Sequence, residues 1–334
     1  MKKIATKTKT TTLVFLSLVV SSLAIGSTFS VSALSAGIIQ LRGGHSVELV
    51  STENCGDGHI CYNLSVSCNK LNSRNVTVKA YHNENSQGSV LFTSGGDGSG
   101  LYGANEAARS IIGGMKNAGY ETFEVIWRGP NDNYGWADGN AGAGFNSLMC
   151  GYAEVAKFIN NKLSANKNTI CATGNSGGSM QISYGLTIYH LDRLLDFAVL
   201  SGGPPAGDLK NICFGNAADS GNTGPARLID FAHGWAGNGD YCVLANQTSE
   251  VVHRLENNSL VPKIKGLRDY NYDTVVSFIQ GASDLDNIYR GKIYYDAIES
   301  EKSWDVLSQV GHQVHQSPVG AEKILGELIE NCKE

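Results

Sequence analysis

The chain has 334 residues, of which 26 are Lys or Arg and 31 are Asp or Glu, and its net charge at pH 7 is −5. A mildly acidic chain without basic runs is not expected to bind nucleic acid or an anionic membrane surface. Hydrophobic residues make up 42% of the sequence, which supplies a sizeable core and argues against disorder.

Residues 1–33 have the three-part pattern of a secretory signal peptide. "MKKIATKTKTTT" carries four lysines and no acid, "LVFLSLVVSSLAIG" is an apolar run of 14 residues, and "VSA" provides small residues for cleavage after Ala33. The apolar run is short for a membrane-spanning helix. We therefore expect a secreted protein, extracellular or periplasmic, with no stable membrane span; an uncleaved N-terminal anchor is the alternative.

Eight cysteines follow, and an even number in an exported chain indicates disulfides. Three of them (Cys55, Cys61 and Cys68) lie in an N-terminal segment at residues 34–74, so at least one must pair elsewhere or stay free. Cys213 and Cys242 could join the two ends of one insertion, but spacing alone does not give the pairing. The cysteines lack metal-ligand spacing, and we expect no metal or organic cofactor.

From residue 75 onward, short β-rich runs alternate with longer helical runs. Strands are expected at 75–82, 90–96, 120–127, 169–173, 196–205, 274–284 and 304–310, and helices at 105–119, 144–163 and 319–332. This order predicts an α/β fold, with a mostly parallel central sheet and helices on both faces. Residues 205–268 are rich in Gly, Asn and Asp and interrupt the alternation. We interpret them as a lid or cap insertion, with a plain surface excursion as the alternative.

The motif Gly174-Asn175-Ser176-Gly177-Gly178 fits two serine-enzyme patterns, besides being a possible turn without chemistry. It resembles the nucleophile loop of chymotrypsin-like and HtrA-like proteases, and also the nucleophile elbow Gly-x-Ser-x-Gly of α/β-hydrolases. The strand "TICAT" abuts the motif, as an elbow requires. The next residues should form a helix in a hydrolase and a strand in a protease. "QISYGLTI" alternates as a strand does, whereas the length of the run through "YHLDRLL" favours a helix.

Chain order separates the two patterns. A chymotrypsin-like enzyme needs a His and then an Asp before the serine, and no upstream histidine has a matching context. After Ser176, "FIQGASD" ends a strand at Asp284, and "VGHQVH" follows the final strand with His312. This is the order Ser, Asp, His. Over residues 75–332 the chain therefore resembles the α/β-hydrolase superfamily, as a secreted esterase or lipase, and residues 75–334 would form the hydrolase domain.

The resemblance implies a catalytic triad. Ser176 would be the nucleophile and His312 its base, with Gly311 allowing close approach of the backbone. Asp284 would fix the imidazole tautomer and stabilise the imidazolium. Three residues compete for these roles: Asp286 and Asp208 as the acid, and His315 as the base.

The resemblance also implies an oxyanion hole. One donor would be the backbone N–H of Gly177, and the other would come from Gly95 or Gly96 in the loop "SGGDGSG". This loop lacks the histidine of the lipase-type His-Gly-Gly-Gly motif. The carboxylate of Asp97 would oppose an oxyanion unless it points away or is hydrogen-bonded.

These residues predict a secreted serine hydrolase that cleaves small-molecule or lipid carboxylic esters through an acyl-enzyme. Thioesterases and acyltransferases use the same groups. The alternatives are a catalytically inactive binding protein with the same fold and a secreted serine peptidase. Trp136 and Tyr134 either line a substrate pocket or pack beneath a loop.

Overall fold

The computed structural model of the protein describes residues 38–41, 45–69, 71–128, 135–138, 143–214, 224–235, 237–262 and 268–333. The predicted signal peptide at residues 1–33 and Tyr134 lie outside the described residues. The chain divides into the units Met1–Ser35 and Ala36–Glu334, and all described elements belong to the second.

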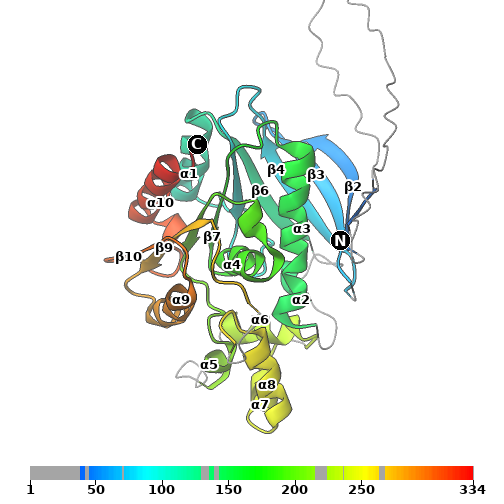
Figure 1. The fold of residues 1–334 in the computed structure, drawn as a ribbon, viewed down its shortest axis with the longest axis vertical. Helices are drawn as coiled ribbons and strands as arrows, with labels where there is room; N and C mark the ends of the chain where they lie inside the picture. Colours follow the sequence, from blue (N-terminus) through cyan, green and yellow to red (C-terminus); the bar gives the residue numbers. More distant parts are fainter. Residues whose placement is uncertain are drawn as a thin grey trace, which may run out of the picture. The chain divides into compact units, whose positions relative to one another are not determined.

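The described strands form one ten-stranded sheet (Figure 1). The strands are β1 (Ile38–Leu41), β2 (His45–Asn54), β3 (Ile60–Ser67), β4 (Arg74–Tyr81), β5 (Ser89–Thr93), β6 (Glu121–Arg128), β7 (Ile170–Asn175), β8 (Phe197–Ser201), β9 (Val275–Gly281) and β10 (Lys302–Leu307). Their order in the sheet is β1-β2-β3-β4-β6-β5-β7-β8-β9-β10. The strands from β1 to β4, together with the β4–β6 pair, are antiparallel, and the remaining pairs are parallel.

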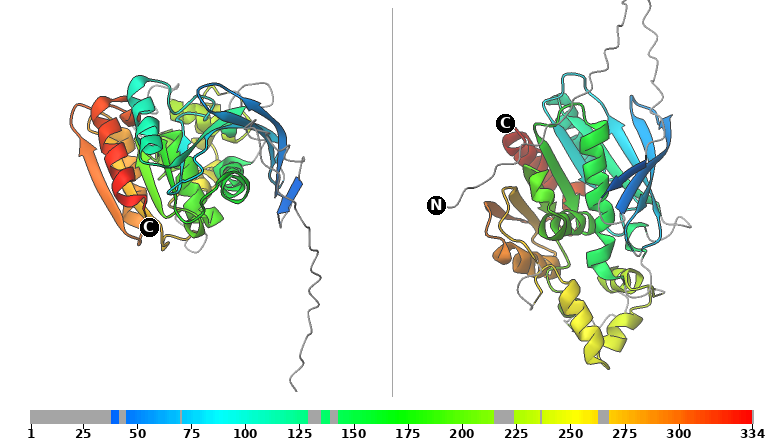
Figure 2. Two further views of the ribbon diagram at one scale, coloured as in Figure 1. Left: turned by 90° about the horizontal axis from the view of Figure 1, so that it is seen from above. Right: turned by 45° about the vertical axis from the view of Figure 1, so that its right-hand side comes forward.

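Helices cover both faces of the parallel part, because its strands are apolar on both sides. In β5, for example, Val90 and Phe92 face one core and Leu91 faces the other. On the first face, α1 (Glu106–Asn117) packs against α10 (Pro318–Asn331), as Figure 2 shows from above. On the second face lie α3 (Cys150–Phe158), α4 (Gly177–Tyr189) and α9 (Leu285–Ala297). This arrangement confirms the predicted fold class.

The segment predicted as one helix at 144–163 is divided in the structure. It comprises α2 (Gly144–Leu148), α3, and a π-helical turn, η2 (Ile159–Leu163). The break at Met149 is slight, because this residue keeps helical backbone angles and its N–H still bonds to the carbonyl of Phe145. The side chains of α3 are almost all buried against the sheet and α4.

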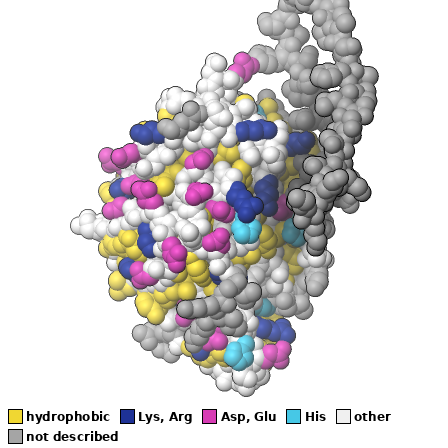
Figure 3. Space-filling view, viewed as in Figure 1, with side chains coloured by type: hydrophobic (Ala, Val, Ile, Leu, Met, Phe, Trp, Pro, Cys, Tyr) yellow, Lys and Arg dark blue, Asp and Glu magenta, His cyan; other side chains and the backbone are white. Residues whose placement is uncertain are grey.

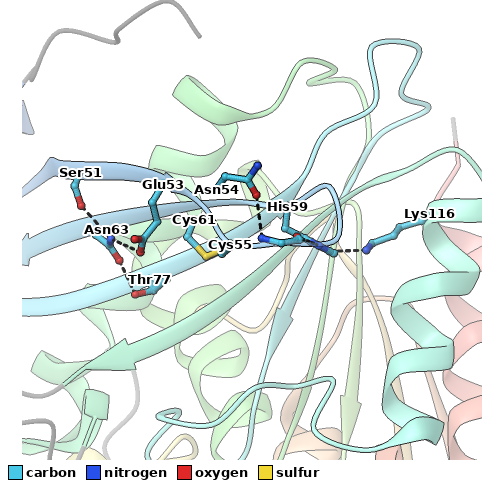
Figure 4. The surroundings of a disulfide bond; sticks show 10 residues. Ser51, Glu53, Asn54, Cys55, His59, Cys61, Asn63, Thr77 and Lys116 are labelled. Atoms are coloured by element: carbon cyan, nitrogen blue, oxygen red, sulfur yellow. Dashed lines mark hydrogen bonds between the residues drawn. A yellow bond between two sulfur atoms is a disulfide. The ribbon is translucent and has the colours of Figure 1, made fainter. Parts of the chain in front are cut away.

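The N-terminal segment at 34–74 contributes β2 and β3 to the same sheet. From Tyr62 to Ser67 along β3 every second side chain is buried, and the others lie on a polar, partly exposed face. Figure 4 shows how this polar face is joined across strands. The side-chain amide of Asn63 donates to Ser51 Oγ (3.0 Å) and Glu53 Oε1 (3.2 Å), while Thr77 Oγ1 donates to Asn63 Oδ1 (2.8 Å).

All eight cysteines form disulfides: Cys55–Cys61, Cys68–Cys150, Cys171–Cys332 and Cys213–Cys242. The third N-terminal cysteine therefore pairs outside its segment, fastening the end of β3 to α3. Cys171 on β7 is joined to the residue that follows α10. The pairing considered for the insertion, Cys213 with Cys242, is present.

Four helices occupy the described part of residues 205–268, between β8 and β9. They are α5 (Leu209–Phe214), α6 (Gly224–Ala232), α7 (Asp240–Ala245) and α8 (Ser249–Asn258). Figure 1 shows them gathered below α4, and α2 packs against α6 and α8. Among the described helices, none has the length and apolarity needed to cross a membrane. Figure 3 shows acidic side chains interspersed with basic ones on the face drawn.

Candidate active site

Ser176 lies in the sharp turn between β7 and α4. Its backbone angles are φ 54° and ψ −112°, a strained conformation for a residue with a side chain. The glycines on either side make the turn possible. A Cβ atom at Gly174 would lie 2.5 Å from Thr93 Oγ1, and one at Gly178 would overlap the carbonyl oxygen of Thr93. The segment after the serine is a helix, as an elbow requires and as the protease pattern does not.

The loop after β5 crosses directly over the start of α4. A Cβ atom at Gly95 would lie 3.4 Å from Ser176 Cβ, and one at Gly177 would overlap the backbone of Gly96. The first N–H groups of a helix have no partner within the helix and form its positive end. In the part of the chain that the structure describes, the N–H of Gly177 makes no backbone hydrogen bond outside its helix, so it is available as a donor beside Ser176. Asp97 Oδ1 accepts hydrogen bonds from the N–H (3.0 Å) and the hydroxyl (2.7 Å) of Ser99, which partly satisfy its charge.

Asp284 and His312 form a hydrogen-bonded pair at the ends of β9 and β10. His312 Nδ1 lies 2.6 Å from Asp284 Oδ2. Since a carboxylate can only accept, the proton of the neutral imidazole is on Nδ1, and Nε2 is left as an acceptor. Burial raises the pKa of Asp284, but hydrogen bonds from His312 and Asn287 outweigh burial and hold the pKa below its usual value.

The glycine that lets these two loops approach is not the one expected from the sequence. A Cβ atom at Gly311 would meet nothing within 4 Å, whereas one at Gly281 would overlap the carbonyl oxygen of Gly311. Gly281 ends β9, three residues before Asp284. The residue that must lack a side chain therefore lies in the loop that carries Asp284, not in the loop that carries His312.

The His312 loop adjoins the end of β7. Gly202, with φ +54°, has no room for a Cβ because the carbonyl oxygen of His312 lies against it. Asn175 Nδ2 lies 3.4 Å from Gln313 Oε1. These contacts bring the histidine loop beside the residue that precedes Ser176. In the described part of the chain, Ser176 Oγ has no hydrogen bond to His312; such bonds often form fully only when substrate is bound.

The three competing residues have other surroundings. Asp286 is 62% exposed, 4.0 Å from the Arg290 guanidinium, and Asp208 caps the N–H of Asn211 at 3.2 Å. His315 is 1% exposed and packs against Tyr102, with ring centroids 4.7 Å apart and the ring planes tilted by 37°. Burial and the neighbouring His312 lower the pKa of His315 to about 4. The structure thus brings together Asp284 and His312, not their rivals.

Asn287 was not anticipated from the sequence. Its side-chain nitrogen lies 2.9 Å and 3.0 Å from the two carboxylate oxygens of Asp284 and 3.2 Å from His312 Nδ1. The available signal was its position three residues after the acid, which puts both side chains on one face of a helix start. Trp136 is 1% exposed and packs against Phe145, so it lies beneath the surface.

Among the described residues, one cluster has the residue types of a metal site. The ligand atoms of His45, Cys150 and Glu154 lie within 4.8 Å of one another. Cys150 is joined to Cys68, so its sulfur is not a thiolate and cannot serve as a strong ligand. One histidine nitrogen and one carboxylate group remain as donors, which is too few for a closed zinc site.

No family model matches the chain, and no curated protein matches it in sequence. Solved structures do resemble it. Acetyl xylan esterase 1 from Thermoanaerobacterium sp. JW/SL YS485 has a TM-score of 0.56 at 16% identity, covering 85% of this chain and 87% of that one. Carboxyl esterase 2 from Tuber melanosporum has a TM-score of 0.52 at 15% identity, covering 84% and 90%.

A puromycin hydrolase has a TM-score of 0.58 at 12% identity, covering 86% of this chain and 43% of that one. At these identities the likeness concerns the fold alone. Together with the strand order and the turn at Ser176, these likenesses show that the chain has the α/β-hydrolase fold.

Proposed function

We propose that the protein is a secreted serine hydrolase that cleaves carboxylic esters through Ser176, His312 and Asp284. The observation that carries this proposal is the combination of a serine in a strained strand-to-helix turn with an Asp–His pair at the ends of later strands. A strained serine is costly to maintain without a function, since such backbone angles cost on the order of 1–3 kcal/mol.

In the proposed reaction, Ser176 Oγ attacks the ester carbonyl carbon while His312 Nε2 takes the hydroxyl proton. The Nδ1–H of His312 stays bound to Asp284, whose negative charge stabilises the imidazolium that forms. The imidazolium then gives its proton to the leaving alcohol oxygen, which leaves Ser176 acylated. Water, deprotonated by His312, attacks the acyl carbon; the proton returns to Ser176 Oγ and the carboxylic acid is released.

The tetrahedral oxyanion would be stabilised by the backbone N–H of Gly177 and by an N–H of the loop at Gly95 and Gly96. The close passage of this loop over the start of α4 supports the assignment. The positive end of the α4 dipole adds to it. Donors of this kind are worth about 3–4 kcal/mol each in transition-state stabilisation.

Small-molecule or lipid esters are the proposed substrates. Two of the similar structures are esterases by name, which supports ester over amide cleavage. The helices between β8 and β9 would act as a lid over the carboxyl ends of the strands. Four disulfides and the signal-peptide pattern support secretion, because disulfides persist in oxidising compartments.

The proposal is tested with a fluorophosphonate probe on the oxidised protein lacking residues 1–33, with mass spectrometry of the adduct. We expect labelling at Ser176, none in Ser176→Ala, and strongly reduced labelling in His312→Gln, since the hydroxyl then has no base. Ser183→Ala is the matched control, because this buried serine of α4 bonds to the carbonyl of Ser179 and makes no hydrogen bond to Ser176 in the described structure; it should label as the wild type does. A folded wild type that takes no label, with or without detergent, would favour the inactive binding protein.

A further inference from the structure

Asn287 is the third residue of α9 and is 7% exposed. Its side-chain nitrogen bridges both oxygens of Asp284, at 2.9 Å and 3.0 Å. It also lies 3.2 Å from His312 Nδ1, while that nitrogen donates to the same carboxylate at 2.6 Å. Three residues therefore meet at one point, with the carboxylate as the shared acceptor.

The identity of the donors follows from this geometry. A carboxylate accepts only, so the amide group must present its nitrogen to Asp284. Because His312 Nδ1 already carries a proton, it cannot accept from Asn287, and the two N–H groups converge as neighbours on the acid. The two contacts from Asn287 thus fix the orientation of the Asp284 carboxylate. They also place the positive end of the amide dipole beside the imidazole.

Ordinary helix capping does not account for this arrangement. In a capping box, the side chain at the third position reaches back to the backbone N–H of the N-cap residue. Asp284 is the N-cap of α9, but its N–H already donates to the carbonyl oxygen of Gly281 at 2.9 Å. The backbone N–H of Asn287 also favours the charged Asp284 carboxylate, as at an N-cap, but this backbone contact needs no amide side chain at position 287. The side chain of Asn287 is therefore directed at the acid and not at the helix end.

We propose that Asn287 is a positioning residue that holds the Asp284 carboxylate against His312 and moderates how strongly the imidazole binds a proton. The proposal rests on the proposed function, in which these two residues are the acid and the base. Asn287 touches no reacting atom; it acts through Asp284.

The direction of the effect follows from the charges around the pair. On α9, Arg290 and Asp286 face this region, and Asp208 from the segment after β8 interacts with Arg290. His315, in the loop after β10, is close enough to His312 to interact with it. None of these residues changes when Asn287 is replaced. Loss of the amide removes a donor that competes for the carboxylate and a positive dipole next to the ring. Both changes favour the imidazolium, so His312 would titrate at higher pH.

The test compares Asn287→Leu, Asn287→Asp and, as a matched exposed control, Asn331→Leu on α10. The readouts are kcat and KM for p-nitrophenyl butyrate against pH, and the 1H–15N NMR titration of the His312 ring, assigned with His312→Gln. For Asn287→Leu we expect kcat to fall roughly tenfold with KM changed less than about twofold, because the base is misoriented during proton transfer. The acid limb of kcat/KM and the ring titration should both move up by about half a pH unit.

Asn287→Asp keeps the size of the side chain and should move both midpoints further, since it adds a like charge beside Asp284. A fall in kcat with unmoved midpoints would overturn the proposal and leave a structural role. An unchanged kcat would overturn it as well. If the wild type hydrolyses no ester and takes no fluorophosphonate label, the proposed function fails, and the ring titration alone decides: a shift in both variants upholds control of His312 by Asn287, and no shift overturns it.

Discussion

His312 and His315 are three residues apart but occupy opposite environments. The side chain of His312 is 35% exposed and has a carboxylate partner, whereas His315 is 1% exposed and rests on the ring of Tyr102. His315 Nδ1 has no hydrogen-bond partner among the described residues. His315 Nε2 lies 3.4 Å from the side-chain nitrogen of Gln316, a long contact that does not offset burial. The ring is therefore held neutral, and it couples folding to pH.

We predict that His315→Phe reduces the acid sensitivity of the fold. Burial lowers the pKa of His315 to about 4 from an ordinary 6.5, so the unfolded chain binds the proton first. The stability contributed by the neutral ring is present above pH 6.5 and is lost as the pH falls toward 4. Between pH 7 and pH 4 the wild type should lose roughly 3 kcal/mol more unfolding free energy than the variant. Urea titrations at both values measure this, and equal losses would contradict it.

At the residue scale, the order of the candidate catalytic residues along the chain was the most useful signal in the sequence. The order Ser, Asp, His selected Asp284 and His312, which the structure brings together; their catalytic role stays a prediction. Asn287 was missed because an amide has no motif of its own. The choice between His312 and His315 could not be made from spacing, since both follow the same strand.

Among the elements, α4 explains why the sequence around Ser176 was ambiguous. Its first 11 residues, Gly177 to Thr187, are all buried, because the helix packs against the sheet and α3, and Tyr184 of α4 donates to the carbonyl of Asn258 at the end of α8. A helix buried on every side has no polar stripe, so its 3.6-residue period disappears. Alternation at Ile182, Tyr184 and Leu186 then imitates a strand. Length was the better guide because it does not depend on which face is exposed.

We predict opposite effects for two glycine-to-alanine changes in helices. Gly178→Ala should destabilise the protein by roughly 2 kcal/mol or more, because the new methyl group overlaps the carbonyl oxygen of Thr93. Gly113→Ala on α1 is the control, since a Cβ there meets nothing within 4 Å. It should stabilise by about 0.5–1 kcal/mol through the lower entropy of the unfolded chain. Urea unfolding measures both, and a loss of stability in each would contradict the steric argument.

For the whole molecule, the sequence predicted the class of the sheet but not its full extent. The alternation of strands and helices implied a parallel sheet, because that order has few other solutions. It did not indicate that residues 45–67 extend the sheet as β2 and β3. Antiparallel neighbours are selected by side-chain matches across strands, which a single sequence does not reveal. The disulfide pairing depended on the same missing information.

We predict that two disulfides differ in their contribution to stability. Cys171–Cys332 closes a separation of 161 residues and Cys55–Cys61 a separation of 6. Replacing both cysteines by alanine should lower the unfolding free energy by about 5 kcal/mol for the first pair and about 2 kcal/mol for the second, because longer loops restrict the unfolded chain more. Chemical denaturation of the two double variants measures the difference. Equal losses would show that local packing outweighs loop closure.

The position of Cys332 in the chain also limits when the Cys171–Cys332 disulfide can form during synthesis and folding. Cys332 follows α10, so its thiol leaves the ribosome only after every described strand and helix has been made. Both sulfurs belong to residues with 0% exposure in the finished fold. An oxidant must therefore reach them in the interval between synthesis of α10 and its docking on the sheet. A chain that docked α10 under reducing conditions would seal two thiols inside, and later exposure to oxidant would come too late without partial unfolding.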